Sequence, residues 1–262
     1  MHAMKRHKPA RVIDPAKYMV TVIDYDNLAK EFIREHHYSG SYPAARLRVG
    51  LWSRTGPDLV GVAVFGIPSH PLTFARYVDG ATPDEGVELN RLVILDEVAS
   101  NAETWFLAQC FRVIEARMPH IRFVLSFSDP IPRQRPDGTV FMPGHLGTIY
   151  QAHNGIYVGK SKMKTTYIAP DGRRFYRRTL NKLRHGEQGR VYVEKQLMEI
   201  GAPSRGVDEE PTKWVDSLIE SGLLRKETHP GNHAYVWALG NKRQKKQTTR
   251  RFVRSLPYPK GD

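Results

Sequence analysis

The sequence predicts an α+β fold in which a mixed, mostly antiparallel sheet carries helices on both faces and is followed by a basic α+β extension. Two observations predict this class. Segments with the alternating apolar pattern of strands are interspersed along the chain with segments that have helical periodicity. Hydrophobic residues make up 40% of the 262 residues and charged residues 26%, a balance typical of folded globular chains. We therefore expect one main domain and a smaller module.

The first elements alternate between strand and helix. An apolar strand is predicted at 18–23 and a helix at 25–36, with Leu28, Phe32 and Ile33 on one face. Strands at 46–52 and 59–65 flank a Gly-Pro-Asp turn and are expected to form an antiparallel hairpin.

The main domain continues with a strand at 87–94, a helix at 102–116 and a strand at 121–127. A loop rich in proline and glycine then leads to a short helix from about Gly144 to His153 and a strand at 156–158. We assign 1–16 to a basic lead and 17–162 to this main domain.

Residues 163–262 form the predicted basic extension. Its elements are a hairpin around Pro170-Asp-Gly172, helices near 179–186, 191–200 and 211–222, and a last strand at 233–239. The helix that contains Trp214, followed by the strand through Tyr235, is similar to a helix with a β-wing, as in winged-helix DNA binders. A packing appendage without base contacts is the alternative.

Positive charge is concentrated in the last part of the chain. Residues 160–262 hold 23 Lys and Arg against 11 Asp and Glu, whereas residues 1–159 hold 17 against 16. This distribution favours a polyanionic partner such as double-stranded DNA, because neutralised phosphates release counterions; a solvated basic tail is the alternative. The candidate DNA-binding residues are Arg173, Arg174, Arg177, Arg178, Lys182, Arg184, Lys242, Arg243, Lys245 and Lys246.

The single cysteine and the absence of long apolar runs exclude several classes. Cys110 lies in a helical pattern and is expected to be a buried hydrophobe, which excludes an internal disulfide and a cysteine-cluster zinc site. No apolar run approaches the roughly 20 residues that cross a bilayer. We expect a protein that is neither exported nor membrane-spanning.

Polar residues that could carry chemistry end the predicted strands. Ser126 and Asp129 follow a buried strand; Asp129 could accept a proton from an amine, or could simply begin an Asp-Pro turn. Tyr150 could donate a proton or stabilise an oxyanion, or could be a core aromatic. His37 and Tyr38 stand at a helix end, where an imidazole also suits the helix dipole.

A second group of residues could anchor an anionic donor or phosphate. Arg91 lies in an otherwise apolar strand, so it must either pair with Glu88 or face a pocket. Gly144 and Gly147 could present backbone amides to a phosphate, and His145 and Asn154 add polar groups to the same segment.

Four motifs occur in a characteristic order: His37-Tyr-Ser-Gly40, Glu88-Leu-Asn-Arg-Leu92, Ser126-Phe-Ser-Asp-Pro130 and the segment from Gly144 to Asn154. Together they resemble the Mom family of DNA-modification proteins from Mu-like phages. The resemblance spans roughly residues 18–160 and continues weakly to Leu256-Pro-Tyr-Pro-Lys260. It implies a fold related to the Gcn5-related N-acetyltransferases, whose order of strands and helices the predicted elements share.

The resemblance further implies an acyltransferase-like enzyme that adds a carbamoylmethyl group to the exocyclic amine of adenine in duplex DNA. Such a protein protects phage DNA from restriction in the host cytoplasm, and His37 and Tyr38 would lie at its active site. The family's link to iron makes His36, His37, Asp129 and His145 a candidate metal-binding set, although their spacing is not that of a known metal motif.

The donor is the least determined part of this hypothesis. Acetyltransferases hold coenzyme A pyrophosphate in a glycine-containing loop, but the corresponding residues 96–104 contain no glycine and three acidic side chains. An aminoacyl-tRNA or another activated glycyl or acetyl carrier is the alternative to acetyl-coenzyme A. Two other functions stay open: an acetyl-coenzyme A-dependent N-acetyltransferase acting on a small molecule or protein, and a non-enzymatic basic DNA-binding protein.

Overall fold

The computed structural model describes residues 12–56, 58–99, 101–134 and 138–260. The chain divides into two compact units, each of which is described by itself below. The first unit runs to Lys160 and resumes at Asn232, and the second consists of Ser161–Gly231.

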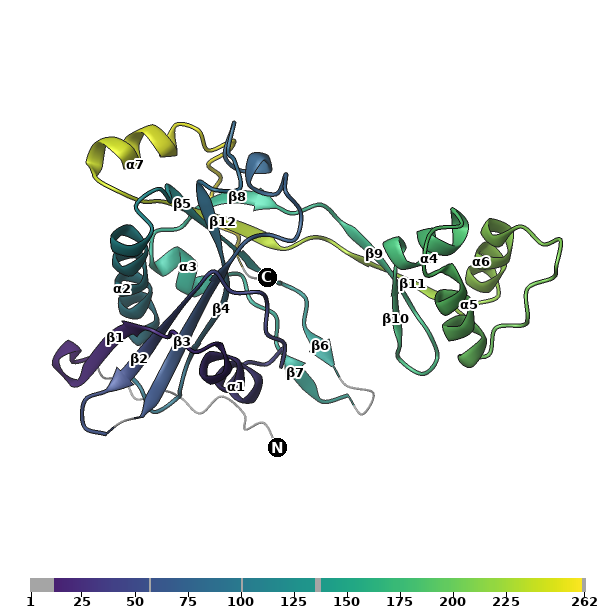
Figure 1. Ribbon diagram of the computed structural model, residues 1–262, viewed down its shortest axis with the longest axis horizontal. Coiled ribbons are helices and arrows are strands. Elements are labelled where there is room, and N and C mark those ends of the chain that lie inside the picture. Colours follow the sequence, from purple (N-terminus) through teal and green to yellow (C-terminus); the bar gives the residue numbers. More distant parts are fainter. Residues whose placement is uncertain (1–11, 57, 100, 135–137, 261–262) are drawn as a thin grey trace. The chain divides into compact units, whose positions relative to one another are not determined.

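A seven-stranded sheet forms the first unit (Figure 1). Its order is β1 (Tyr18–Val22), β2 (Leu47–Ser53), β3 (Leu59–Gly66), β4 (Gly86–Ile94), β5 (Phe123–Ser128), β12 (His233–Ala238) and β8 (Ile156–Lys160). All neighbouring strands are antiparallel except β4 and β5. The expected class, a mixed and mostly antiparallel sheet, is therefore confirmed.

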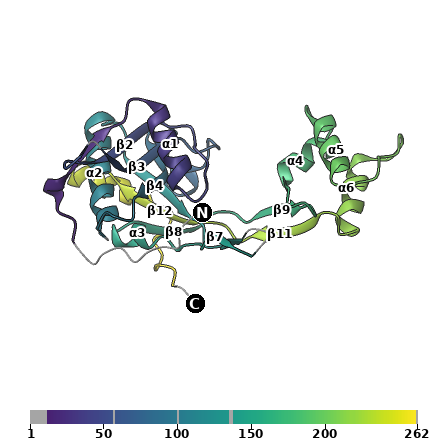
Figure 2. The same ribbon diagram turned by 90° about the horizontal axis from the view of Figure 1, so that it is seen from below.

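Helices cover both faces of this sheet (Figure 2). On one face, α2 (Ala102–Arg117) contributes Phe106 and Leu107 to the core cluster that contains Ala63 and Phe65 of β3, and α3 (Thr148–Ala152) lies on the same side. On the other face, α1 (Asp26–His36) packs against the alternate β3 residues Val62 and Val64. Strand β3 is buried on both sides, which explains its nearly continuous apolar sequence.

Shorter elements complete the first unit. They are the 3₁₀ turns η1 (Pro15–Lys17) and η2 (Phe74–Arg76), the two-stranded sheet of β6 (Arg133–Gln134) and β7 (Val140–Met142), and the helix α7 (Lys242–Thr249). Phe74 and the partly buried Phe252 after α7 pack against the same face of β5 and β12. In the described part of the chain, no helix has both the length and the apolar composition needed to cross a membrane.

Strands β4 and β5 separate within the sheet. Their parallel pairing extends from Gly86↔Phe123 to Leu89↔Ser126 and stops there. On the β3 side, Leu89 and Arg91 pair with neighbouring residues, so Asn90 is an extra residue in a β-bulge. Beyond this point β4 continues beside β3, and β5 continues beside β12. The carboxyl ends of the two strands therefore leave polar side chains around a gap in the sheet.

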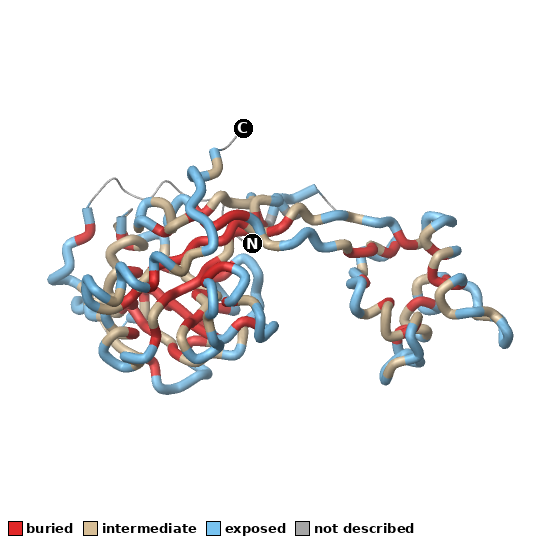
Figure 3. The backbone as a smooth tube through the Cα atoms, turned by 90° about the horizontal axis from the view of Figure 1, so that it is seen from above, coloured by how far each residue is buried: buried red, intermediate tan, exposed pale blue. Residues whose placement is uncertain are grey.

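The second unit is a small α+β module with its own core. It has a three-stranded sheet in the order β10 (Arg174–Tyr176), β9 (Lys164–Ile168) and β11 (Arg225–His229). Between β10 and β11 the chain forms three helices, α4 (Arg177–Arg184), α5 (Arg190–Glu199) and α6 (Pro211–Glu220). Trp214 and Phe175 are buried at its centre. Figure 3 shows buried segments in each unit separately.

The structure corrects the expected domain division. The extension was placed at 163–262, but only Ser161–Gly231 forms the separate unit. Residues from 232 onward return to the first unit, because β12 fills the position between β5 and β8. Of the expected lead at 1–16, residues 1–11 lie outside the described residues.

Three local expectations also change. The β-wing is wrong, because β11 pairs with β9 and β12 joins the main sheet, so these consecutive strands do not pair with each other. The short helix starts at Thr148 rather than near Gly144, since Gly144 and Gly147 have positive φ angles of 72° and 79°. The polar segment after β12 forms α7, which a reciprocal Asn241–Gln244 capping box stabilises.

We predict that the second unit is dispensable for folding of the first. Lys160 and His233 are directly paired on the antiparallel neighbours β8 and β12, so Asn-Gly can replace residues 161–232 as a two-residue hairpin turn. The shortened chain should unfold in one cooperative thermal transition and should keep a near-ultraviolet circular dichroism signal, which reports fixed aromatic packing. The full chain is measured as the control. A molten, non-cooperative product would contradict the prediction.

Candidate functional site

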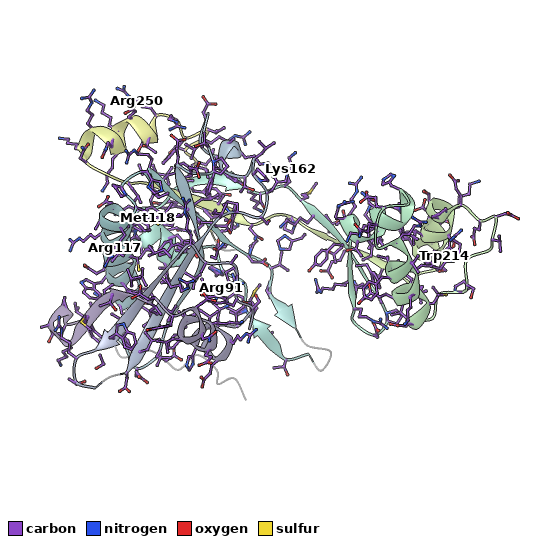
Figure 4. All side chains as sticks on the ribbon, in the orientation of Figure 1. Arg91, Arg117, Met118, Lys162, Trp214 and Arg250 are labelled. Carbon is purple, nitrogen blue, oxygen red and sulfur yellow. The ribbon has the colours of Figure 1, made fainter. Side chains whose placement is uncertain are left out.

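The candidate site is built where β4 and β5 separate. The end of α1 contributes His37 and Tyr38, β4 contributes Arg91, β5 contributes Ser126, and α3 contributes Tyr150. Figure 4 labels Arg91, which lies on the α1 side of the sheet. Charge interactions connect Arg91 with His37, Tyr38 and Tyr150. The structure thus brings together four of the five predicted catalytic residues and Arg91.

Arg91 holds the loop that follows α1. Its Nε donates to the carbonyl oxygen of Ser41 at 3.1 Å, and its Nη2 donates to the Ser41 hydroxyl at 2.7 Å. Its Nη1 donates to its neighbour's carbonyl, that of Asn90, at 2.6 Å. These bonds assign Arg91 a positioning role for the loop, which the sequence did not suggest. Anchoring of a donor or phosphate by its remaining N–H groups stays a prediction.

His37 is neutral and its tautomer is fixed. The imidazole is 9% exposed, and burial, then Arg91, then His145 lower its pKa to about 3. The backbone N–H of Ser39 lies 3.1 Å from Nδ1, and the Ser39 hydroxyl lies 2.8 Å from the same atom. Because a backbone N–H only donates, Nδ1 is the acceptor and the proton resides on Nε2. His37 therefore offers a hydrogen-bond donor to the site rather than a base.

Tyr150 is a protonated phenol held by aromatic packing. Its ring lies 5.6 Å from the rings of both Tyr235 and Trp237. Burial raises its pKa to about 12, and a hydrogen bond with Ser126 acts in the opposite direction. Ser126 itself is buried and donates to the Leu89 carbonyl at 3.0 Å, at the last paired position of β4 and β5. Tyr150 is thus suited to donate a proton or a hydrogen bond.

Asp129 is buried at the end of β5, and its carboxylate has a structural task. Oδ1 accepts the N–H of Ile131 at 3.0 Å, which is the expected Asp-Pro turn. Its carbonyl oxygen accepts the N–H of His145 at 2.8 Å, and the His145 ring lies 6.3 Å from the Tyr150 ring. Asp129 thus borders the site through His145, and its role as a proton acceptor stays a prediction.

The two glycines and Asn154 have structural explanations. A Cβ at Gly147 would lie 2.7 Å from Cε2 of Tyr235 and 3.0 Å from Cδ2 of Tyr150, so a side chain there would push the aromatic pair apart. A Cβ at Gly144 would lie 2.5 Å from the Pro130 carbonyl oxygen. Asn154 follows α3 at φ 58°, a conformation that asparagine tolerates. Phosphate binding by this segment stays a prediction.

Sequence reasoning assigned no role to three residues of this region, although Ser128 was among the polar residues noted at the end of its strand. Ser41 anchors Arg91, but nothing in its sequence context indicates this. Ser128 is fully buried, and its hydroxyl has no hydrogen-bond partner among the described residues. His233 is directly opposite Ser128 in the sheet, and its Nδ1 lies 2.9 Å from the Tyr157 hydroxyl. A polar residue at the start of an apolar strand was the only available signal for His233.

The first turn of α2 is a poor site for a coenzyme A pyrophosphate. The side chain of Asn101 accepts the N–H of buried Ile13 at 2.7 Å, so another chain segment lies at this helix end. The N–H of Ala102 donates to the Ala99 carbonyl, and Glu103 adds negative charge in the first turn. The bonded amide of Ala102, the occupied side chain of Asn101 and the acidic Glu103 disfavour phosphate.

The candidate metal set is not assembled. Across the described residues, no group of three or more His, Cys, Asp or Glu side chains is arranged to hold a metal ion. The His36 ring packs on Phe32 at 4.6 Å, with its Nε2 3.8 Å from the Glu35 carboxylate. The protonated Nε2 of His37 is not a ligand, and its Nδ1 is bonded to Ser39. We therefore derive no step through iron.

The predicted basic cluster of the second unit is largely ion-paired. Four of its arginines have carboxylate partners within the unit: Arg173 with Asp171 and Glu199, Arg174 with Glu227, Arg178 with Glu187, and Arg184 with Asp216. The hydrogen bond from Arg178 lowers the pKa of Glu187, and Lys182 acts in the same direction. Phe175, which lies between these arginines in the sequence, is 3% exposed and belongs to the core. Of the cluster, only Arg177 has no such link in the described structure.

The other predicted DNA-binding residues lie on α7 in the first unit. Lys242, Arg243, Lys245 and Lys246 are all exposed. Lys245 is paired with Glu115, with Nζ 3.5 Å from the carboxylate, whereas the other three have no ion pair in the described part of the chain. The two basic surfaces therefore differ in how much of their charge is neutralised.

We predict that neutral, buried His37 makes stability depend on pH. Its pKa is lower in the folded chain than the ordinary 6.5, so the unfolded chain binds the proton more tightly and stability is lost as pH falls from about 6.5 towards 3. Relative to a His37→Gln variant, the wild type should lose about 2 kcal/mol more unfolding free energy between pH 7 and 5 in urea titrations. Equal losses in both proteins would contradict the assigned burial of the neutral imidazole.

Comparison with known proteins places this chain. Methylcarbamoylase mom of Escherichia phage Mu is 26% identical over 234 residues, which cover 89% of this chain and 80% of that protein. Solved structures with low similarity include a tandem GNAT protein from the clavulanic acid biosynthesis pathway, at a TM-score of 0.37 and 11% identity, matched over 59% of this chain and 48% of that one. Malonyl-CoA decarboxylase from Rhodopseudomonas palustris has a TM-score of 0.35 and 11% identity over 91% of this chain and 60% of that one.

A family model extends over both units. It is described as the Mom protein family, and it matches residues 17–260. Because this match includes most of the chain, the protein belongs to the Mom protein family.

Proposed function

We propose that this chain is a DNA-modifying enzyme that adds a carbamoylmethyl group to the exocyclic amine of adenine in duplex DNA and thereby protects phage DNA from restriction. The observation that carries the proposal is the cluster of His37, Arg91, Ser126 and Tyr150 at the separated ends of β4 and β5, in a chain that belongs to the Mom family. The 26% identity to the phage Mu methylcarbamoylase supports the class of group transferred.

The residues suggest how such a transfer would proceed. The adenine would have to leave the base stack before its amine could reach buried side chains. With an activated glycyl ester as donor, a bond forms between N6 and the glycyl carbonyl carbon, the bond from that carbon to the carrier oxygen breaks with its electron pair leaving on the carrier, and N6 loses a proton. The N6-glycyl product contains the same atoms as N6-carbamoylmethyl, so an intramolecular rearrangement, in which the glycyl nitrogen takes the carbonyl carbon and N6 takes the methylene carbon, gives the product without a further reactant. The Nε2–H of His37 and the phenol of Tyr150 would donate hydrogen bonds to the charge that develops on the donor. Asp129 is the proposed proton acceptor.

The donor is proposed to be an activated glycyl carrier other than coenzyme A, aminoacyl-tRNA included, because a glycyl group contains the carbon, nitrogen and oxygen atoms of carbamoylmethyl whereas an acetyl group contains no nitrogen. The hydrogen bonds and acidic residue at the start of α2 support this choice, because they disfavour a pyrophosphate there. The same observation weighs against an acetyl-coenzyme A-dependent N-acetyltransferase. A purely DNA-binding protein would give no reason for the interaction of buried His37 with the partly buried Arg91 and Tyr150.

The test is mass spectrometry of nucleosides from plasmid DNA of cells that express the chain. Wild type should yield a heavier deoxyadenosine. Tyr150→Phe keeps the ring that packs on Tyr235 and Trp237 and removes only the hydroxyl, so modification should fall by roughly 10² or more without loss of folding. Unmodified adenine in cells with folded wild-type protein would refute the proposal.

A second variant separates the two tasks of Asp129. Asp129→Asn retains an oxygen that can accept the Ile131 N–H of the turn but removes the carboxylate. If Asp129 accepts the amine proton, modification should fall by roughly 10² or more while thermal stability stays near that of wild type. Full modification by this variant would assign Asp129 to the turn alone.

A further inference from the structure

Charge is distributed unequally between the second unit and the segment that follows it. Residues 161–231 contain 14 Lys and Arg against 10 Asp and Glu. Residues 232–262 contain eight Lys and Arg against a single acidic residue, Asp262. Residues 232–262, which belong to the first unit, therefore carry more net positive charge per residue than the second unit.

The cations of this segment face solvent and repel one another. Lys242, Lys246 and Arg250 follow at intervals of four residues, so each like charge is a helical neighbour of the next. Within the described structure, these three residues, Arg243 and Arg254 have no ion pair, and all five are exposed. Intramolecular stability does not explain this unneutralised arrangement, because repulsion between neighbours opposes the helix. A polyanionic partner would relieve it.

Hydrogen bonds fix the chain after α7 to the rest of the first unit. The N–H of Asp79 donates to the Arg251 carbonyl at 2.7 Å, and the Arg251 guanidinium donates to both carboxylate oxygens of Glu85 at 3.1 and 3.0 Å. The N–H of Val253 donates to Tyr77, and the N–H of Leu256 donates to Tyr157 on the edge strand β8, each within 3.0 Å. These bonds attach the segment after α7 to the first unit, and Figure 1 shows α7 itself on the outside of that unit.

The fixed segment ends on an exposed aromatic ring beside the candidate site. Tyr258 is 42% exposed, and its ring lies 6.4 Å from Tyr235, which also has the Tyr157 ring at 5.4 Å and the Tyr150 ring at 5.6 Å. Between this segment and β8 is an open cavity of about 230 Å³, lined by Ile156, Tyr157, Ser255, Leu256, Pro257 and Tyr258. Its walls are aromatic, aliphatic and uncharged, which suits the flat face of a base.

We propose that residues 241–260 are the surface on which the first unit receives nucleic acid, with α7, Arg250 and Arg254 contacting phosphates and Tyr258 stacking on an unstacked base. Cations and an aromatic ring on one segment are the usual requirements for holding a nucleic-acid strand. The proposal rests on the proposed function, because it assigns the DNA surface of that enzyme. It also assigns the smaller share of the phosphate contacts to the paired arginines of the second unit.

The phosphate contacts are tested by fluorescence anisotropy with a short labelled DNA duplex over a range of salt concentrations. The triple variant Arg243→Gln, Lys246→Gln and Arg250→Gln should bind more weakly, with a salt dependence shallower by about one unit per lost phosphate contact. A second triple variant, Arg174→Gln, Arg177→Gln and Arg178→Gln, removes the same amount of charge from the second unit. It should change the slope of the salt dependence less. An unchanged slope in the α7 variant, or an equal or larger change in the second-unit variant, overturns the proposal.

The stacking contact is tested with a duplex that carries one mismatched adenine, because a mismatch lowers the cost of extruding a base. Tyr258→Ala should reduce the preference for this duplex over a matched one by roughly 5- to 150-fold. Tyr258→Phe should retain the preference, since the ring suffices for stacking. Unchanged preference in Tyr258→Ala overturns the stacking role.

These outcomes are separate from failure of the proposed function. Binding is measured without a donor, and modification is measured independently by the mass of deoxyadenosine. If the wild type modifies adenine and the α7 variant binds and modifies DNA equally well, the proposed function is supported and the proposed surface is refuted. If the wild type binds DNA through α7 without modifying it, the surface is supported and the proposed function is refuted.

Discussion

The rest of the first unit depends on the pairing of β12 between β5 and β8. This strand satisfies the edges of both neighbours and supplies Tyr235 and Trp237, against which α3 packs. Trp237 donates to the His153 carbonyl at 3.0 Å, and the Tyr235 hydroxyl donates to the Leu146 carbonyl, so both ends of the α3 segment are tied to β12. Tyr150 therefore owes its position to a strand that is 83 or more residues away in sequence.

The pairing of β12 with β5 and β8 determines how the second unit is inserted into the first. The sheet cannot be completed until the chain has passed through Ser161–Gly231, yet the residues on either side of that insertion are paired as neighbours. Because the ends of the insertion are held together by the sheet, its length adds only a modest loop-closure cost. A self-contained core around Trp214 then lets the inserted unit form without altering the first.

Local sequence patterns predicted most elements but not their assembly. The hairpin of β2 and β3, the hairpin of β9 and β10, and helices α4 to α6 follow from periodicity and turn residues, so short-range information was sufficient. The position of β12 depends on contacts across the insertion, which no local pattern contains, and the domain boundary was misplaced as a result. α7 was missed because its sequence is polar all round, and a helix of that kind gives no amphipathic signal.

The candidate site was predictable in its residue types and not in its hydrogen bonds. The motifs identified His37, Arg91, Ser126 and Tyr150, but only the structure shows that Arg91 holds Ser41 and that Ser39 fixes the proton of His37 on Nε2. Together these bonds leave His37 and Tyr150 as neutral donors and engage the Arg91 guanidinium with the loop, while exposed positive charge lies on α7. Neutral donors at the site and exposed cations on α7 suit a reaction on the uncharged amine of a base within a polyanion. Free cations beside the reacting groups would instead draw phosphates towards those groups. Surface cations can hold the backbone, and neutral donors can then act on the base.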